Sequence, residues 1–484
     1  MTKRKKEFII SFGKYTKRGA VLVLTKKRVD FTDGPMFFKI LLYTLPIIAT
    51  GLLQHMYNMA DNIVVGKFSG DVNALGAVGS TASYTSLIIN LMLGLAGGTA
   101  VLVSQSFGGK RYDELSRTVH TAMSFSVIIG VVFATIGVFI ARPGLILLNT
   151  KDILLDSATL YMQIICIGIP ASAIYNFGAS ILRSVGDSRT PLIILSLSGI
   201  LNVALNLIFV ICLHMSVDGV ALATILSQYA SAAAIVILLM RRKNEPYGLR
   251  IKDARIHTKT LLRTLRLGIP IAVQSSLFSI TNMFIQSAAN TFPPAVISAK
   301  TISSNIDAMV YVITNSFLHA SMTFAGQNFG AGKIDRVKKV ILFSEIQVVV
   351  IGVAVGQLLM LFAEPISSLY IDANDPNRLA VLESTIEQLS LLLPLYFICG
   401  IMESLSGTMR GIGYSTLPMV ITIIGVCGIR IFWVTVMFNF EPFNNIIGLF
   451  LCWPISWIAA SIAMAIALII VLKKQEKKMS IGQK

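Results

Sequence analysis

The chain has 484 residues, of which 13% are charged, whereas about 25% are charged in typical soluble domains. Its mean hydropathy of +0.74 excludes an ordinary water-soluble enzyme, because so few charges cannot cover a surface that faces water. The 41 Lys and Arg residues outnumber the 24 Asp and Glu residues, and this basic excess lies between long apolar stretches, a pattern that favours a membrane protein over a nucleic-acid-binding one.

Residues 1–34 form a basic segment before the first long apolar stretch. Lys and Arg side chains interrupt its short apolar runs, and no small-residue cleavage site follows them, so the segment differs from a signal peptide. We expect a retained cytoplasmic extension in which residues 8–12 form a helix at the membrane surface.

Twelve apolar stretches follow, and each is long enough for a helix that crosses a bilayer core of roughly 30 Å. Helices are predicted because backbone N–H and C=O groups must pair within the segment where no water is available. The fold class is therefore predicted to be all-α and integral to the membrane. The predicted transmembrane helices are residues 37–66, 72–107, 114–141, 153–183, 190–213, 217–240, 264–291, 295–329, 336–363, 379–411, 416–439 and 446–472.

The distribution of basic residues predicts the orientation of these helices. Residues 1–39 contain 11 Lys and Arg residues, whereas the connections after the odd-numbered helices contain four in total. By the positive-inside rule, the even-numbered connections and both termini face the cytoplasm. We therefore expect a multi-pass protein of the plasma membrane with an even number of spans.

Two motifs occur once in each half of the chain. Ser104–Lys110 (SQSFGGK) matches Gly326–Lys333 (GQNFGAGK), and Leu182–Leu192 (LRSVGDSRTPL) matches Met409–Met419 (MRGIGYSTLPM). This duplication predicts two six-helix lobes related by a pseudo-two-fold axis along the membrane normal, an architecture of transporters. The predicted organisation is an extension at 1–34, lobes at 35–242 and 263–474, a cytoplasmic linker at 243–262 and a tail at 475–484.

The sequence lacks the motifs of ATP-driven pumps and of metalloenzymes. Residues 241–263 are too few for a nucleotide-binding domain, and neither a phosphate-binding G-x-x-x-x-G-K-[ST] loop nor an H-E-x-x-H pair occurs. The five cysteines have no C-x-x-C spacing. We therefore expect a transporter without enzymatic activity, cofactor or structural metal, driven by an ion gradient or by its substrate's own gradient.

The stretch Gln54–Gly66 (QHMYNMADNIVVG), followed by the two pairs of repeated motifs, resembles the multidrug and toxic compound extrusion (MATE) transporters from about Met36 to Leu472. The resemblance implies alternating access between two six-helix lobes and export of amphipathic organic cations in exchange for H⁺ or Na⁺. It further implies a monomer that contacts membrane lipids and small molecules. The alternative is a flippase for lipid-linked oligosaccharides. Because Lys300 and Arg430 are the basic residues counted within the spans, the pattern favours the drug exporter.

Polar residues in the first half indicate an ion site. Asp61 is the first carboxylate within a span, and such residues usually lie on ion or substrate paths. A carboxylate among amide and hydroxyl oxygens suits a proton or Na⁺. The predicted ion-coupling residues are Asp61 with Gln54 and Asn58 on the same helical face, Asn202 and Asn206 in the fifth span, Asn176 in the fourth and Thr224 in the sixth.

In one branch of the MATE family an Asp in the first helix and an Asn-x-x-x-Asp pair in the fifth form the coupling site. Asp61 and Asn202 match that pattern, and Asn206 stands where a second Asp is often found. The glutamate that another branch has in the seventh helix is absent here, so the resemblance is closer to the first branch. With one carboxylate we favour H⁺ over Na⁺, because burial favours the neutral acid. The alternative is that Asp61 caps the outer end of its helix.

The second half offers candidates for substrate binding. Glu403 is interpreted either as a carboxylate that faces the substrate cleft or as the ion-pair partner of Arg430. Asp307 lies seven residues from Lys300, which suggests either a local ion pair or a cleft position. Soft and aromatic side chains suit flat organic cations. The remaining cleft candidates are Gln274, Asn282, Met56, Tyr57, Tyr175, Phe278 and Met283.

Overall fold

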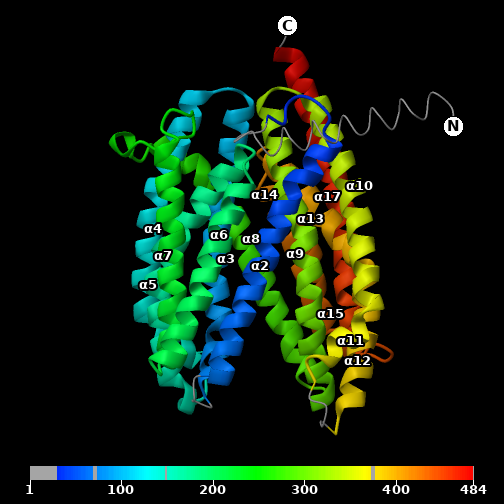
Figure 1. The fold of residues 1–484 in the computed structure, drawn as a ribbon. Helices are drawn as coiled ribbons and strands as arrows, with labels where there is room; N and C mark the ends of the chain where they lie inside the picture. Colours follow the sequence, from blue (N-terminus) through cyan, green and yellow to red (C-terminus); the bar gives the residue numbers. More distant parts are fainter. Residues whose placement is uncertain (1–29, 69–72, 148–149, 372–375, 483–484) are drawn as a thin grey trace, which may run out of the picture.

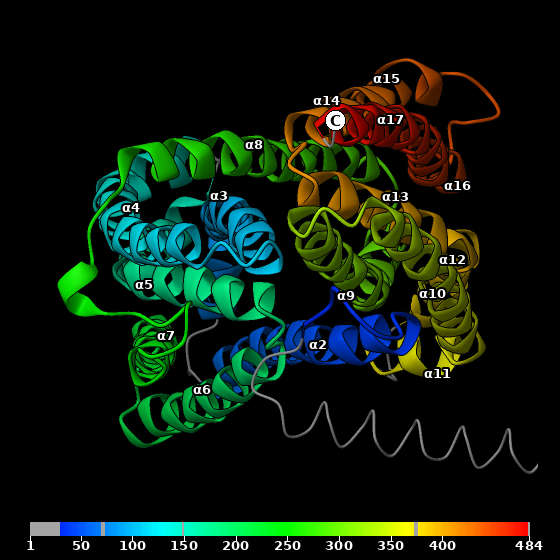
Figure 2. The same cartoon turned by 90° about the horizontal axis from the view of Figure 1, so that it is seen from above.

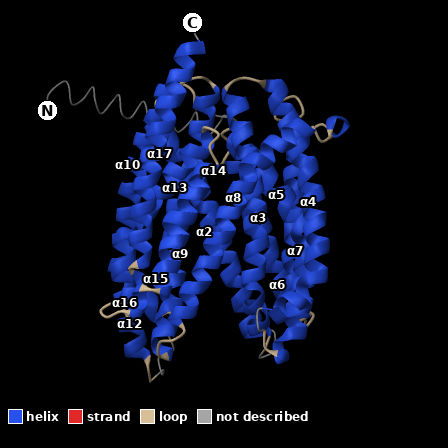
Figure 3. Cartoon of the chain, turned by 180° about the vertical axis from the view of Figure 1, so that it is seen from behind, coloured by secondary structure: helices blue, strands red, loops and turns tan. Residues whose placement is uncertain are grey.

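The computed structural model describes residues 30–68, 73–147, 150–371 and 376–482, and all regular secondary structure in these ranges is helical (Figure 3). The helices form two groups that meet at one end of the molecule and diverge toward the other (Figure 1). We call the end where they meet, which is also the end where the last helix finishes, the closed end. This arrangement confirms the predicted all-α fold with two lobes.

The N-terminal lobe is built from the first six long helices. Their connections are short, so successive helices are antiparallel neighbours. The elements are α2 (Phe37–Phe68), α3 (Ala74–Gly108), α4 (Tyr112–Leu147), α5 (Asp152–Ser184), α6 (Arg189–Leu207) with a π-helical extension η1 (Ile208–Cys212), and α7 (Val217–Arg241).

The C-terminal lobe repeats this order, with three of its predicted spans divided into shorter elements. Pro394 lies in the 3₁₀ turn that divides the tenth predicted span, because proline cannot donate the backbone hydrogen bond of a continuous α-helix. The connection between the lobes contains η2 (Ile251–Asp253). The elements of the C-terminal lobe are α8 (Thr258–Ala289), α9 (Pro294–Gly330), α10 (Ile334–Leu361), α11 (Ala363–Ser368), α12 (Arg378–Leu392), η3 (Leu393–Leu395), α13 (Tyr396–Gly411), α14 (Thr416–Thr422), η4 (Ile423–Gly428), α15 (Ile429–Thr435), η5 (Met437–Asn439), α16 (Ile446–Phe450) and α17 (Cys452–Gly482).

Helix α9 differs from the other predicted spans in polarity. Eleven helical stretches of the described residues are long and apolar enough to cross a membrane, and α9 is not among them. It contains Lys300 and Asp307, yet it runs beside the other helices (Figure 1). It packs against α2, α3, α10, α12 and α13, so protein covers much of its surface. This environment explains how a span can be more polar than its lipid-facing neighbours.

Helix α2 packs first on the C-terminal lobe and then on its own lobe. Ile40, Tyr43 and Ile47 belong to the hydrophobic core of the C-terminal lobe. Val64 and Val65, near the other end of α2, pack in the N-terminal lobe. Proline 46 lies between these two parts of the helix.

Helix α8 makes the reciprocal crossing. Its first half packs closely on α3, where a Cβ at Gly94 would lie 2.4 Å from the Ala272 Cα atom. Its second half packs on α14, α15 and α16 of its own lobe. Figure 2 shows α2 and α8 at opposite edges of the molecule, each spanning both lobes. In each lobe, the first half of the first helix therefore packs on the other lobe.

The last residues before α2, which end the predicted extension over residues 1–34, pack on the C-terminal lobe. Phe31 is 2% exposed and stacks on Phe324 of α9 with ring centroids 3.8 Å apart. Arg336 donates hydrogen bonds to the carbonyl oxygens of Phe31 and Gly34, both at 3.2 Å. The predicted interfacial helix over residues 8–12 lies outside the described residues.

The connection between the lobes is bound to α4. The Arg250 N–H donates to His120 Nε2 at 3.0 Å, and the His257 N–H donates to the Thr121 hydroxyl at 3.2 Å. Helix α8 begins at Thr258, six residues before the predicted start at 264, because its first turn lies beyond the apolar pattern.

Candidate functional site

Asp61 lies at the meeting point of α2, α6 and α7. Asn206 donates a hydrogen bond of 2.5 Å from Nδ2 to Asp61 Oδ1, and Asn202 Oδ1 accepts from the same Asn206 amide at 3.4 Å. The Asn202 amide in turn faces the Thr224 hydroxyl at 3.4 Å. The structure thus brings together four of the predicted ion-coupling residues: Asp61, Asn202, Asn206 and Thr224. We call these four residues the Asp61 cluster.

The Asp61 cluster contains a carboxylate and an amide oxygen with spare capacity to accept hydrogen bonds or bind a cation. No cationic side chain forms an ion pair with Asp61 in the described part of the chain. Asn206 is fully buried, and its Oδ1 atom has no hydrogen-bond partner. A buried acceptor without a donor is uncommon in proteins and fits the binding of a small cation. Tyr161 on α5, which the sequence pattern does not single out, lies close enough to interact electrostatically with Asp61.

Three other predicted ion-coupling residues lie outside this cluster. Asn176 donates back to the Ser172 carbonyl oxygen of its own helix at 2.9 Å. Gln54 and Asn58 have exposed side chains on α2. Polar residues one turn apart in a helix can bond locally, so helical spacing alone could not place Asn176.

Arg430 is held by residues other than Glu403, so the structure contains no Glu403–Arg430 ion pair. Its Nε atom donates to the Ser456 hydroxyl at 3.1 Å, and Nη1 donates to Asn282 Oδ1 at 3.2 Å. The guanidinium also lies over the Phe278 ring, 4.9 Å from its centroid. The fully buried Arg430 therefore packs among an amide, a hydroxyl and an aromatic ring.

Glu403 and Arg410 occupy the same helix, α13. Glu403 is 7% exposed, and Arg410 is the cation that acts on its carboxyl group. The Arg410 guanidinium donates to Gln274 Oε1 at 2.9 Å, and the Gln274 amide donates to Thr422 at 3.0 Å. Gln274, proposed from the sequence as a cleft residue, thus positions a buried arginine, as Asn282 does for Arg430.

Asp307 and Lys300 interact electrostatically without forming an ion pair. The Lys300 ammonium instead donates to Gln286 on α8. Seven residues of helical separation bring the two residues to one face of α9, but a partner on the neighbouring helix takes the lysine.

The aromatic and methionine candidates have different environments. Tyr175, a predicted cleft candidate, lies in the core of the N-terminal lobe and donates to the Pro191 carbonyl oxygen at 3.0 Å. Tyr57 donates to the Ser196 carbonyl oxygen at 3.2 Å. Met56 and Met283 are 60% and 48% exposed, as expected of residues that contact lipid or substrate.

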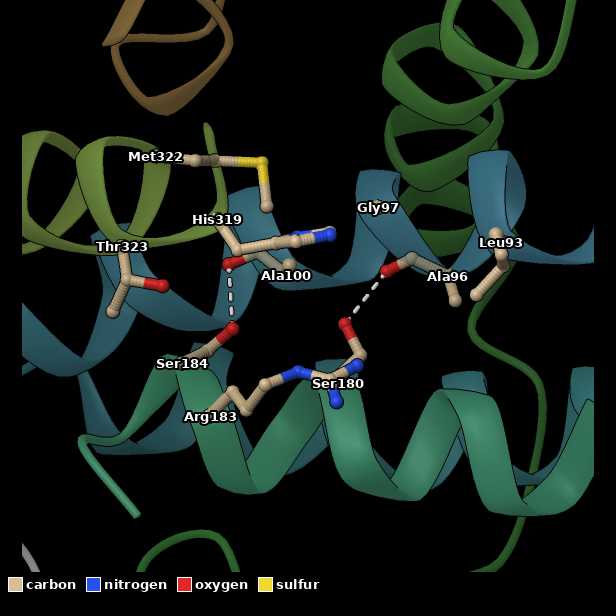
Figure 4. Close-up of a pocket in the computed structure, with 10 residues that line it drawn as sticks. All are labelled: Leu93, Ala96, Gly97, Ala100, Ser180, Arg183, Ser184, His319, Met322 and Thr323. Atoms are coloured by element: carbon tan, nitrogen blue, oxygen red, sulfur yellow. Dashed lines mark hydrogen bonds between the residues drawn. The ribbon is translucent and has the colours of Figure 1, made fainter. Parts of the chain in front are cut away.

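A cavity lies between the lobes near the closed end (Figure 4). Arg183 of α5 and His319 of α9 approach it from opposite lobes, and neither forms an ion pair with a described residue. Ser180 and Ser184 fix α5 on α3 by donating to the Ala96 and Ala100 carbonyl oxygens at 2.9 and 3.1 Å. The remaining lining residues are Leu93, Ala96, Gly97, Ala100, Met322 and Thr323.

Two reciprocal hydrogen bonds join the lobes at the closed end. Gln105 of α3 donates to the Gly411 carbonyl oxygen at 2.7 Å, and Gln327 of α9 donates to the Ser184 carbonyl oxygen at 2.8 Å. The donors occupy matched positions of one repeated motif, and the acceptors occupy matched positions of the other. We call this pair of hydrogen bonds the inter-lobe latch.

Two glycines allow the latch helices to touch. A Cβ atom at Gly108 would lie 2.0 Å from the Gln327 carbonyl oxygen, and a Cβ atom at Gly330 would lie 2.0 Å from the Gln105 carbonyl oxygen. Both contacts involve backbone atoms, which cannot move aside as a flexible side chain can. The repeated glycines of the sequence therefore place α3 and α9 in direct backbone contact across the pseudo-two-fold axis.

Two charged groups carry a signal that the apolar pattern obscures. Arg183 and Arg410 occupy matched positions of the repeated motif. Each lies in the last turn of its helix, so the count of basic residues assigns it to a connection and not to a span. Glu345 is a carboxylate within the predicted span 336–363, and its charge is the feature of the sequence that indicates a functional residue.

The MatE family model matches residues 46–208 and 270–436, one segment in each lobe. A probable multidrug resistance protein, YoeA of Bacillus subtilis (strain 168), is 26% identical over 89% of this chain and 91% of its own length. The probable multidrug resistance protein NorM of Thermotoga maritima is 24% identical over 80% and 82%, respectively. A FAD transporter of Shewanella oneidensis is 22% identical over 73% and 78%.

Solved structures share the fold. One described as the outward-facing conformation of a multidrug resistance MATE family transporter of the MOP superfamily has a TM-score of 0.85 at 22% identity, and the match covers 94% of this chain and 99% of the other. A MOP superfamily transporter from Pyrococcus furiosus, described as having a binding pocket of reverse polarity, has a TM-score of 0.82 at 22% identity and covers 95% and 99%.

Proposed function

Because the chain belongs to the MATE family of membrane transporters, we propose that it exports amphipathic organic cations in exchange for protons. The observation that carries the ion assignment is the Asp61 cluster, where a carboxylate and an orphaned amide oxygen meet without a counter-cation. The same family membership makes the chain a multi-pass membrane transporter and not an enzyme.

The closed end is proposed to face the cytoplasm of a plasma-membrane protein. The basic N-terminal region and the basic connection between the lobes are both attached to helix ends at the closed end (Figure 1). With this orientation the lobes diverge toward the outside, and the conformation is outward-open. The space between the diverging lobes is the proposed substrate path, with Glu403, Met56 and Met283 as its candidate contacts.

Helix α2 links the proposed ion site to the closed end. Asp61 lies in its outer half, and Tyr43 in its inner half donates to the Arg183 carbonyl oxygen at 2.8 Å. Protonation of Asp61 would weaken the charge-assisted hydrogen bond from Asn206 and so change how α2 packs on α6. We infer that this change is carried along α2 to the inter-lobe latch.

The choice of ion rests on the number of charges and oxygens in the cluster. One carboxylate, two amide oxygens and one hydroxyl give fewer ligands than the roughly six oxygens that hard cations of this kind take. A proton needs only the carboxylate and therefore suits the cluster better than Na⁺, which is the alternative ion.

Ethidium efflux from proteoliposomes tests this proposal. An imposed pH gradient without Na⁺ is expected to drive dye transport, and a Na⁺ gradient at equal pH is expected to drive little. Transport under the Na⁺ gradient alone would show that Na⁺ is the coupling ion.

A second candidate substrate class is organic anions. Arg183 approaches the inter-lobe cavity without an ion-pair partner among the residues that the structure describes, and a curated relative is a FAD transporter. Competition separates the two classes: an anionic flavin nucleotide should leave ethidium efflux unchanged if the substrates are cations, and should inhibit it if anions bind along the same path.

A further inference from the structure

Glu345 is a buried carboxyl group that the proposed ion site does not use. It lies eleven residues after the start of α10, about 16 Å along the helix at ~1.5 Å per residue. Both of its carboxyl oxygens are inaccessible to solvent and have no partner in good hydrogen-bond geometry, although the Ser404 hydroxyl lies close enough to interact. Such a group is unusual, because buried polar atoms almost always have partners.

No cation neutralises Glu345 in the described part of the chain. Helix α10 packs against α2, α9, α11, α13 and η3, and no charged group on these elements acts on the carboxyl. The charged and titratable groups of these neighbours are otherwise placed. Lys39 donates to backbone oxygens, Lys300 to Gln286 and Arg410 to Gln274, and the Tyr43 hydroxyl donates to the Arg183 carbonyl oxygen. None of the other titratable groups on these elements provides a cation that pairs with Glu345; they are His55, Tyr57, Asp61, Asp307, Tyr311, His319, Glu364, Tyr396, Cys399 and Glu403.

Hydroxyl groups from two neighbouring helices surround the carboxyl. Ser404 of α13 faces it, and the Ser404 and Ser321 hydroxyls are 2.8 Å apart at the contact between α13 and α9. Ser344, beside Glu345 on α10, has a buried hydroxyl oxygen without a partner. The site therefore combines one carboxyl group of α10 with the linked hydroxyls of Ser404 and Ser321 from α13 and α9, and it has no balancing charge among the described residues.

Physical chemistry requires this carboxyl to bind a cation. An ionised carboxylate buried without a counter-charge is strongly destabilised, so the group must be neutral or paired. A proton neutralises it without further ligands, whereas Na⁺ would need several more oxygens. We propose that Glu345, with Ser321 and Ser404, forms a second proton-binding site of this transporter, located in the C-terminal lobe.

The site lies next to the C-terminal half of the inter-lobe latch. On α9, Ser321 lies fewer than two helical turns before Gln327. On α13, Ser404 lies about two turns before Gly411. Opening of the latch moves these two helices, so it changes the surroundings of Glu345. Its role in coupling rests on the proposed H⁺ exchange, whereas proton binding itself does not.

Carbodiimide labelling tests proton binding directly. Dicyclohexylcarbodiimide reacts with protonated carboxyl groups in apolar surroundings, and peptide mass spectrometry of the full-length protein in nanodiscs locates the label. We expect labelling of Glu345 at acidic pH and a fall of about tenfold per pH unit once most of the carboxyl is ionised. Glu364 on α11 is exposed and serves as the matched control, which should remain unlabelled.

The opposite results are equally clear. An unlabelled Glu345 at every pH, while the protein remains folded by its melting profile, would overturn the proposal. Protection of Glu345 by Na⁺ at constant pH would overturn the proton assignment and identify Na⁺ as the ligand.

Transport by E345Q separates the coupling role from binding. Glutamine keeps the size of a neutral glutamic acid, so the variant is expected to fold. We expect E345Q to move fewer protons per dye molecule than wild type, and E364Q to be unchanged. Labelling of Glu345 together with an unaltered proton-to-dye ratio in E345Q would overturn the coupling role. A wild-type protein that ignores the pH gradient would instead contradict the proposed function, whatever the labelling result.

Discussion

At the scale of single residues, Asp61 is the group on which the proposed exchange depends. Asp61→Asn removes the charge and leaves an amide of the same size beside Asn206. We expect the variant to insert and to bind ethidium but to lose gradient-driven efflux, because no proton can be taken up at the cluster. Efflux assays in cells and dye binding by the purified protein measure the two properties.

Asn176→Ala is the matched control for Asp61→Asn. Its side chain bonds within α5 and does not reach the cluster, so transport should be retained. Normal export by Asp61→Asn against a drug gradient would contradict the assignment.

Arg430 offers a second test at this scale, because its partners differ from those that its charge suggests. Asn282→Ala removes the amide oxygen that accepts from Nη1 and should cost about 1.5–3 kcal/mol of stability, the range for hydrogen bonds to charged groups. Glu403→Gln should cost less stability than Asn282→Ala, because Glu403 forms no ion pair with Arg430 and interacts with Arg410 without an ion pair, and it should weaken binding of cationic dyes. Thermal unfolding in detergent compares the two variants; a large loss of stability in Glu403→Gln would contradict the observed contacts.

At the scale of elements, the inter-lobe latch depends on two backbone contacts between α3 and α9. Gly108→Ala places a methyl group 2.0 Å from a backbone oxygen, and overpacking of this kind costs about 1–3 kcal/mol or more. The conformation in which the lobes meet at the closed end should be disfavoured by roughly 5- to 150-fold relative to the conformation in which they separate there. Distances between spin labels on the two lobes at the closed end measure this shift, which Gln327→Ala should reproduce more weakly.

Gly79→Ala provides the control in the same helix, because a Cβ atom there meets nothing within 4 Å. An unchanged distance distribution in Gly108→Ala would show that the glycine contacts do not limit closure.

The elements also show what the sequence can predict. Apolar stretches define the spans because lipid imposes one requirement on every residue of a helix, and repeated motifs define the two lobes. The sequence could not predict that Pro394 divides one span, or that Asn176 bonds back along its own helix, since both depend on local geometry. The Asp61 cluster was predictable in part, because buried polar groups must find one another across helices. The partners of Arg430 were not predictable, because several helices offer acceptors at the same depth.

At the scale of the whole molecule, the crossed packing of α2 and α8 has a consequence for how the protein is made. The part of α2 that contains Ile40 and Tyr43 leaves the ribosome long before α9 and α10, the helices that cover it. Until these helices arrive, the N-terminal half has an uncovered surface and is open to degradation, so neither half is a self-sufficient folding unit. Residues 1–242 produced alone should therefore be short-lived in pulse-chase experiments, and co-production of residues 243–484 should restore their lifetime. A long-lived N-terminal half would mean that α2 finds a different partner during synthesis and exchanges it later.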